Sequence, residues 1–413
     1  MQIKALQDDR ISDLPDHVLH HLLSFLPARA AVQTCVLAKR WRYLWRSTTA
    51  LRIVDNDGTE PVLAWEQHEF MDHLLTLRER TDLDTVVMRL EGFHENDQPY
   101  VHQWIHFAII SKVRALTVDI FDGLLCLDEM TLVSRHLKTL DLCNVDLQKN
   151  FDFASCPALE DLKIWLCRIC AGRISSRSMK HLTITDCINA DKDCRLCIST
   201  PGLLSLKLDT SYSTPLLGDM PLLETAYVSV WYSMGDDYDT CLSYHSGVFC
   251  GANNSACKNC GSVRNSVLLG GIISAKHLVL KSSLRKFIFS RDLKYCPTFS
   301  KLKTLLLNEY WCEAPDLDPL ACILKKSPVL EKLTIEFFVR GENHKVEIEG
   351  RCVSVKRSAA ISEHLKVVEV MCTELDERIL KVLVFLSAFI QFSFHTKRIL
   401  SKHCEICMNV NNV

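Results

Sequence analysis

The chain has 413 residues, enough for two or three domains, and its 48% hydrophobic and 24% charged residues are typical of a soluble globular protein. Its 48 basic and 50 acidic residues give a formal net charge of -2. This balance offers no whole-chain electrostatic attraction for nucleic acid or for an anionic membrane.

The first ten residues, MQIKALQDDR, have no apolar core and no cleavage pattern, so we expect no secretory signal. The 20 cysteines are therefore expected in a reducing compartment, where thiols stay free or bind metal. The most apolar segment, VLVFLSAFIQFSF at 382–394, is shorter than the roughly 18 to 20 residues that span a bilayer and predicts a buried helix. The sequence predicts a soluble protein of the cytoplasm, the nucleus or both, without a membrane partner.

Three short helices are predicted within DLPDHVLHHLLSFLPARAAVQTCVLAKRWRYLW, residues 13–45. Ser12 or Asp13 can cap the first helix, whose first turn accommodates Pro15 and which Pro27 ends. Apolar side chains recur at helical spacing along this helix, at Leu14, Val18, Leu19, Leu22, Leu23 and Leu26.

The second and third helices are also rich in apolar side chains. The second carries Val32, Cys35 and Val36, and the third places Trp41, Leu44 and Trp45 at i, i+3 and i+4. Because roughly 40 residues bury too little surface to be stable alone, this excess indicates either an interface with another protein or packing against the rest of the chain. The basic residues at 39–46 also fit a helix-turn-helix, but their alternation with apolar residues favours a solvated helix face.

The stretch DRISDLPDHVLHHLLSFLPARAAVQTCVLAKRWRYLW closely resembles the F-box of the large plant family of F-box proteins. The resemblance covers residues 9 to about 48 almost without a gap, and the pairing of LPDHVLHHLLSFLP with VLAKRWRYLW is highly specific. It implies a three-helix F-box at 9–48 that docks onto a Skp-type adaptor and, through it, a cullin–RING ubiquitin ligase. The residues implied for docking are Leu14, Pro15, Val18, Leu19, Leu22, Leu23, Leu26, Val36, Trp41, Leu44 and Trp45.

A short pattern, apolar-x-x-apolar-x-apolar, returns along the middle of the chain. It reads VRALTV at 113, LKTLDL at 137, LEDLKI at 159, MKHLTI at 179, LLSLKL at 203, LETAYV at 223, AKHLVL at 275, LKTLLL at 302, LEKLTI at 330 and LKVVEV at 365. The first six start 24, 22, 20, 24 and 20 residues apart, within the roughly 20 to 29 residues of leucine-rich repeats. We predict an α/β chain with an irregular leucine-rich-repeat solenoid, a curved parallel sheet, at 80–340, capped by a first strand near 83–90.

Two of the repeats carry cysteine at the ninth position, where leucine-rich repeats have a buried Asn or Cys. Cys167 follows LEDLKI, and Cys187 follows MKHLTI. Both thiols are therefore predicted to be buried parts of the repeat and not metal ligands.

Strand geometry predicts which repeat residues a partner can contact. Alternate side chains point into the core, and those between them face the concave side. A mixture of charges and aromatic rings there suits recognition of a protein or a polar small molecule, although a merely solvated strand face has the same pattern. The target-binding candidates are Asp141, Lys163, Trp165, His181, Lys207 and Tyr227, of which the two aromatics belong to types enriched at binding hot spots.

The last third of the chain extends the resemblance. Residues 299–335 resemble the last leucine-rich units of the plant F-box proteins, and ISEHLKVVEVMCTELDERILKVLVFL resembles the FBD region that follows them, a strand leading to a helix. We assign an FBD-like region to 355–395. The tail at 396–413 departs from the family pattern.

A Cys/Gly-rich insert at 233–265 interrupts the repeats. It contains Cys241, His245, Cys250, Cys257 and Cys260, but only the last two have ligand-like spacing, which favours a surface loop with free thiols over a zinc site. The chain has no G-x-S-x-G, P-loop, G-x-G-x-x-G or H-E-x-x-H motif. We therefore expect no cofactor, no metal and no catalytic residue.

The resemblance to plant F-box proteins implies a non-catalytic substrate-recognition subunit of an SCF-type ubiquitin ligase, and the repeat pattern predicts the solenoid. The F-box would bind the Skp adaptor, and the repeats would hold a target protein for ubiquitin-dependent degradation. Two other interpretations stay open: a leucine-rich-repeat interaction protein without a ligase role, and a zinc-dependent nucleic-acid-binding protein built on the insert. Binding of a Skp adaptor tests the first, and zinc analysis tests the second.

Overall fold

The structure is a computed structural model with two compact units, Met1–Arg168 (the N-terminal unit) and Ile169–Val413 (the C-terminal unit). Each unit is described by itself. The residues that the structure describes are 11, 14–55, 58, 60–128, 132–149, 151–189, 196–211, 215–231, 268–282, 292–293, 296–312, 317–337, 362–372, 376–388, 392–399 and 403–410.

The N-terminal unit opens with short helical segments. They are α1 (Asp16–Ser24), α2 (Ala28–Gln33) and the 3-10 turns η1 (Thr34–Val36), η2 (Lys39–Arg42) and η3 (Leu44–Ser47). The predicted third α-helix is therefore wrong in type, because its residues form two 3-10 turns separated by Tyr43. Bulky aromatic side chains lose rotamer freedom in an α-helix, and three residues per turn place Trp41 and Leu44 on one line toward the core.

These helical segments share a core with the strands that follow. Both α1 and α2 contact β1 (Ala50–Ile53). The half-buried Arg78 guanidinium donates to the backbone carbonyls of Trp45 and Thr48, and desolvation lowers its pKa to about 10. Arg29 Nε donates to Gln67 Oε1 at 3.2 Å. The rest of the chain thus supplies part of the packing surface that the short helices need.

Parallel strands follow in the N-terminal unit, in the neighbour order β1, β3 (Thr85–Glu91), β4 (Ala115–Ile120), β6 (Thr139–Cys143) and β8 (Asp161–Trp165). The sheet therefore begins before the predicted capping strand near 83–90, because β1 pairs with β3 on its other edge. The shorter strands are β2 (Val62–Leu63), β5 (Leu125–Leu127), β7 (Val145–Leu147) and β9 (Arg168–Ile169).

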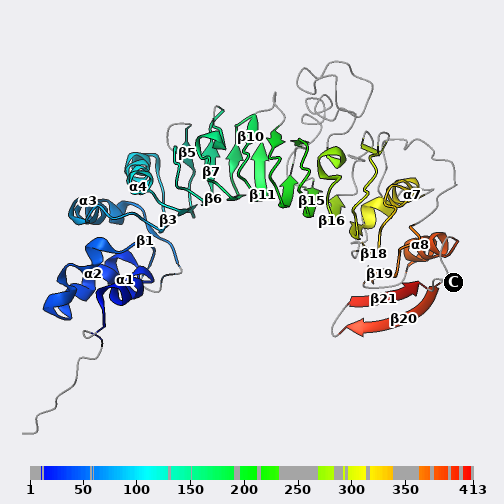
Figure 1. Cartoon of the computed structure of the whole chain (residues 1–413), viewed down its shortest axis with the longest axis horizontal. Helices are drawn as coiled ribbons and strands as arrows, with labels where there is room; N and C mark the ends of the chain where they lie inside the picture. Colours follow the sequence, from blue (N-terminus) through cyan, green and yellow to red (C-terminus); the bar gives the residue numbers. More distant parts are fainter. Residues whose placement is uncertain are drawn as a thin grey trace, which may run out of the picture. The chain divides into compact units, whose positions relative to one another are not determined.

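Helices α3 (His68–Leu77) and α4 (Gln98–Ile110) lie beside these strands (Figure 1). In α4 the buried side chains are Val101, Trp104, Ile105 and Ala108, whose spacing forms one helical face. The 3-10 turns of this unit that remain are η4 (Trp65–Gln67), η5 (Glu95–Asp97) and η6 (Phe153–Ser155).

The C-terminal unit continues the repeat pattern with further parallel strands. Its neighbouring strands are β11 (His181–Asn189), β13 (Ser205–Ser211), β15 (Thr225–Trp231), β16 (His277–Ser282), β17 (Thr304–Asn308), β18 (Lys332–Glu336) and β19 (Val367–Cys372). A second parallel sheet joins β10 (Arg173–Ser175), β12 (Cys197–Ser199) and β14 (Leu216–Leu217).

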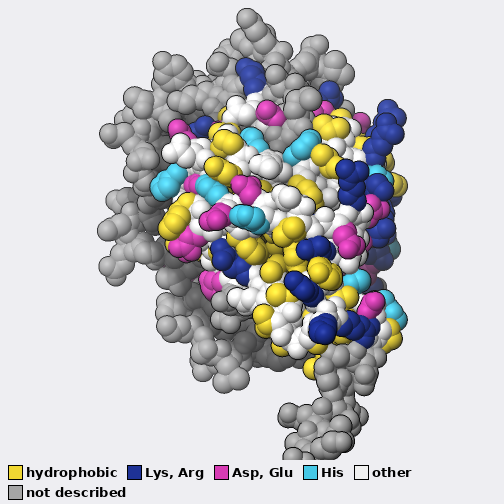
Figure 2. All heavy atoms as spheres, turned by 90° about the vertical axis from the view of Figure 1, so that its left-hand side faces the viewer, with side chains coloured by type: hydrophobic (Ala, Val, Ile, Leu, Met, Phe, Trp, Pro, Cys, Tyr) yellow, Lys and Arg dark blue, Asp and Glu magenta, His cyan; other side chains and the backbone are white. Residues whose placement is uncertain are grey.

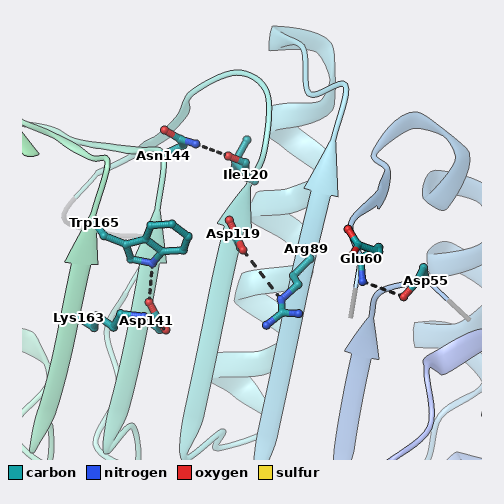
Figure 3. Close-up of polar contacts among 9 residues, drawn as sticks. All are labelled: Asp55, Glu60, Arg89, Asp119, Ile120, Asp141, Asn144, Lys163 and Trp165. Atoms are coloured by element: carbon teal, nitrogen blue, oxygen red, sulfur yellow. Dashed lines mark hydrogen bonds and ion pairs between the residues drawn. The ribbon is translucent and has the colours of Figure 1, made fainter. Parts of the chain in front are cut away.

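Each of the ten predicted repeat motifs forms a strand that begins two residues after the motif starts. In β8, for example, Leu162 and Ile164 are buried while Lys163 between them is exposed. The residue after several strands turns the chain away in the left-handed conformation, as at Asn144 (φ 52°) and Leu166 (φ 54°). Asn144 tolerates this conformation, and its Nδ2 donates to the carbonyl of Ile120 at 2.6 Å (Figure 3). The predicted leucine-rich-repeat fold is confirmed.

The end of the C-terminal unit forms the predicted strand and helix, followed by a hairpin. After η7 (Leu269–Ile272), η8 (Glu309–Cys312) and α7 (Asp318–Lys325), β19 leads to α8 (Glu377–Ser387). Arg378 Nη1 of α8 donates to Glu309 Oε2 at 2.7 Å. Strands β20 (Phe392–Ile399) and β21 (His403–Val410) pair antiparallel, and β21 also pairs antiparallel with β19 (Figure 1). The divergent tail therefore contributes strands to the sheet.

The expectation that 382–394 forms one buried helix is wrong. Helix α8 ends at Ser387, β20 begins at Phe392, and the Val384 side chain is 68% exposed. Phenylalanine is a residue type that is enriched in strands, and this segment pairs with β21 along its whole length. Within the described part of the chain, no helix combines the length and apolarity that a membrane crossing requires.

Candidate interaction surfaces

The predicted adaptor-binding residues separate into a buried group and an exposed group. Leu19, Leu23, Trp41, Leu44 and Trp45 are at most 8% exposed. These side chains form the core beneath the surface, and their contact with an adaptor stays a prediction. Apolar burial, which contributes about 1.5–3 kcal/mol for each large side chain, favours filling this core.

The exposed group lies on the same short segments. Leu22 is 45% exposed, Leu26 is 36% exposed and Val36 is 82% exposed. Pro15 is exposed, and Leu14 and Val18 are half-buried. These residues, in contrast to the buried group, are available to a partner.

Sequence reasoning missed further members of this surface, namely Ile11, Phe25, Leu37 and Tyr43, which are 51–66% exposed. The signal was present in α1, which is apolar on two faces. Leu19 and Leu23 face inward at i and i+4, whereas Leu22, Phe25 and Leu26 face outward at i, i+3 and i+4. A surface helix needs only one apolar face, so the second face indicates a partner.

We call Leu22, Phe25, Leu26, Val36 and Leu37 the apolar docking face. Figure 2 shows hydrophobic side chains gathered at this end of the molecule, with Lys and Arg side chains beside them. The exposed cations of these helical segments are Arg29, Lys39, Arg40 and Arg42. Arg40 is paired with Asp16 at 2.5 Å. The surface therefore combines apolar contact area with positive charge, which suits a partner with an acidic rim.

Three of the predicted target-binding residues meet on the exposed sheet face of the N-terminal unit (Figure 3). Trp165 Nε1 donates to Asp141 Oδ1 at 3.0 Å, and Lys163 Nζ donates to Asp141 Oδ2 at 3.3 Å. The Lys163 ammonium also lies 5.2 Å from the centroid of the Trp165 ring. Trp165 is half-buried and held by these neighbours, so it is a preorganised part of a polar cluster. Arg89 and Asp119 form a neighbouring ion pair at 4.0 Å.

The other three candidates lie on adjacent strands of the C-terminal unit. His181 begins β11 and is exposed, Lys207 is on β13, and Tyr227 is its register partner on β15. Lys207 Nζ lies 5.8 Å from the centroid of the half-buried Tyr227 ring, within reach of a cation–π attraction. The structure thus brings Lys207 and Tyr227 together.

A groove of about 390 Å³ lies over the starts of β13, β15, β16, β17 and β18. It includes Lys207 and Tyr227 among its lining residues and adds His277, Thr304 and Lys332. His277 Nδ1 lies 2.9 Å from Thr304 Oγ1. No local motif predicts this groove, because its walls come from strands that only the parallel register aligns.

The two cysteines at the ninth position of their repeats are buried, as predicted. Cys167 is 1% exposed and Cys187 is 4% exposed. The backbone N–H of Val145 donates to Cys167 Sγ at 3.3 Å. This hydrogen bond joins two neighbouring repeats. Within the described ranges, no three His, Cys, Asp or Glu side chains converge as a metal site would require. The zinc candidates in the insert at 233–265 lie outside the described residues.

Burial predicts an order of thiol modification. When the native full-length chain is treated with a maleimide, we expect Cys35 and Cys170, which are half-buried, to react before Cys167 and Cys187. Mass spectrometry of tryptic peptides over a time course measures each rate, and the denatured chain is the control in which all rates converge. Early labelling of Cys167 would show that the repeat register is wrong.

Comparison with known proteins covers both units. Residues 11–50 match the F-box domain family. The MEIOTIC F-BOX protein MOF of Oryza sativa subsp. japonica is 30% identical across 88% of this chain and 80% of its own length. An F-box/FBD/LRR-repeat protein of Arabidopsis thaliana is 27% identical across 84% of this chain and 81% of its own length, and an FBD-associated F-box protein of the same plant is 29% identical across 54% and 61%. The first two similarities each cover more than four fifths of this chain.

Proposed function

Because this chain belongs to the plant F-box proteins that carry leucine-rich repeats and an FBD region, we propose that it is a substrate-recognition subunit of an SCF-type ubiquitin ligase. The observation that carries the proposal is the apolar docking face. Its large side chains are exposed on segments that the F-box domain family matches. A surface of this kind supports binding of another protein, here a Skp-type adaptor.

The proposed division of labour follows from the two kinds of surface. The apolar docking face holds the adaptor and, through it, a cullin–RING assembly. The exposed sheet faces, with their polar cluster and groove, hold a target protein in the cytoplasm or the nucleus. The chain then acts by proximity, because it raises the effective concentration of a target lysine near a ubiquitin-conjugating enzyme. No catalytic residue in this chain is needed for that role.

The experiment is co-elution of the full-length chain with a recombinant plant Skp adaptor. We expect a complex with one copy of each protein in size-exclusion chromatography with light scattering at physiological ionic strength. The affinity should fall as salt is added, because cations border the docking face. Two separate peaks from folded proteins would overturn the ligase role. The chain would then be a leucine-rich-repeat interaction protein that has no part in a ligase.

A second measurement addresses the insert. Metal analysis of the purified chain, after removal of loosely bound ions, should yield no stoichiometric zinc if the insert is a loop with free thiols. One zinc per chain would favour the nucleic-acid-binding alternative, whose ligands would come from the cysteines and histidine of 233–265.

A further inference from the structure

The groove of the C-terminal unit has two aligned rows of side chains. The parallel register places Ser205, Thr225, His277, Thr304 and Lys332 side by side at the strand starts. Two residues further along, it aligns Lys207, Tyr227, Val279, Leu306 and Thr334. All ten side chains line the groove, which is open to solvent on one side. The first row is polar, and the middle of the second row is apolar.

The charge of this groove is concentrated at one end. No ion pair to Lys207 occurs among the described residues, and its ammonium lies near the Tyr227 ring. At the other end, Lys332 is neutralised by Glu369 at 2.7 Å, and Thr334 Oγ1 donates to the same carboxylate at 3.2 Å. No carboxylate side chain is among the lining residues. Lys207 is therefore positioned to attract a negative group on a ligand.

A further ion pair bounds the groove beyond the second row. Lys281 of β16 meets Glu336 of β18 at 2.5 Å, across the strand that lies between them, and the two side chains are 16% and 17% exposed. The two charges of this pair neutralise each other. A ligand can therefore contact only the side chains of the two rows. A ligand that follows these rows must cross the strands.

We infer that this groove binds an extended peptide segment of the target protein, with an acidic residue over Lys207 followed by apolar residues over Tyr227, Val279 and Leu306. The inference rests on the proposed function, because it names the kind of target segment. Five strands about 4.8 Å apart span about 19 Å, which an extended peptide covers with about six residues. The hydroxyl groups and His277 of the first row supply hydrogen-bonding partners for the peptide backbone.

The test is selection of peptides from a displayed library of random heptapeptides on the immobilised full-length chain. We expect enrichment of sequences in which Asp or Glu precedes two or three apolar residues. Lys207→Glu should reverse the charge preference toward Lys or Arg, and it should weaken binding of the peptide selected on the unmodified chain by at least about tenfold, since like charges then face each other. Tyr227→Ala should weaken binding of that peptide, but the variant should still prefer peptides with an acidic residue.

The matched control is Lys325→Glu, which makes the same charge change at an exposed position on α7, outside the groove lining. It should leave the selected sequences and affinities unchanged. Circular dichroism establishes that each variant is folded. The inference is overturned if no peptide is enriched, if enriched peptides lack the acidic residue, or if Lys207→Glu selects the same sequences as the unmodified chain. Adaptor co-elution is scored separately, so loss of the ligase role and loss of the groove are distinguishable.

Discussion

The double substitution Phe25→Ala with Leu37→Ala should weaken binding of a Skp adaptor by several hundredfold while the protein stays folded. Both side chains belong to the apolar docking face and are 62% and 66% exposed. Truncation of a hot-spot residue costs about 2 kcal/mol or more, and each 1.4 kcal/mol is about tenfold in affinity. Surface substitutions usually change the free energy of unfolding by no more than about 0.5 kcal/mol. Isothermal titration of adaptor into each purified chain measures the difference.

The matched control for this prediction is Leu77→Ala. Leu77 ends α3 and is 47% exposed, but it lies outside the segment that the F-box domain family matches. Its truncation removes comparable apolar area and should leave adaptor affinity unchanged. Equal affinity for adaptor in the double variant and the unmodified chain would show that the apolar docking face is not the adaptor surface.

Leu19→Ala should destabilise the N-terminal unit by about 2–5 kcal/mol, whereas Leu22→Ala on the same helix should change its stability by less than about 1 kcal/mol. Leu19 is fully buried in the core that α1 shares with β1, and Leu22 is 45% exposed. Removing buried methylene groups loses transfer free energy and leaves a cavity. The two substitutions are chemically identical, so burial alone separates their effects.

Hydrogen exchange under increasing urea, read from peptides that cover residues 16–53, measures the opening free energy of this unit in each variant. Leu22→Ala should reduce adaptor affinity in the folded protein, whereas Leu19→Ala should reduce it by lowering the folded population. Similar opening free energies for the two variants would contradict the assignment of Leu19 to the core and Leu22 to the surface.

The shared core also bears on how the F-box is tested. The F-box segments and the sheet of the N-terminal unit have a common core, because α1 and α2 contact β1 and Arg78 binds the carbonyls of Trp45 and Thr48. Deleting residues 1–50 would remove the start of β1 and expose its apolar face. Point substitutions on the apolar docking face therefore separate adaptor binding from target binding more cleanly than a deletion does.

The F-box segment, the repeat strands and the burial of Cys167 and Cys187 could be predicted from the amino-acid sequence. These features are local: a strand motif with period-two alternation buries the same positions wherever it pairs, and the constant offset between motif and strand shows this in every repeat. For the same reason, the exposed positions of Lys207 and Lys163 could be predicted from their place between buried residues.

Three features depend on tertiary packing and could not be predicted: which apolar face of α1 is buried, where the sheet begins, and how the strand faces combine. Leu19 and Leu22 are the same residue type on one helix, and contact with β1 and the 3-10 turns determines which of them is covered. Strands β1, β20 and β21 lack the repeat motif and are placed by their pairing with β3 and β19. The groove depends on lateral register between strands separated by tens of residues, which no local pattern encodes, because hydrogen bonding between strands aligns side chains that are distant in the chain.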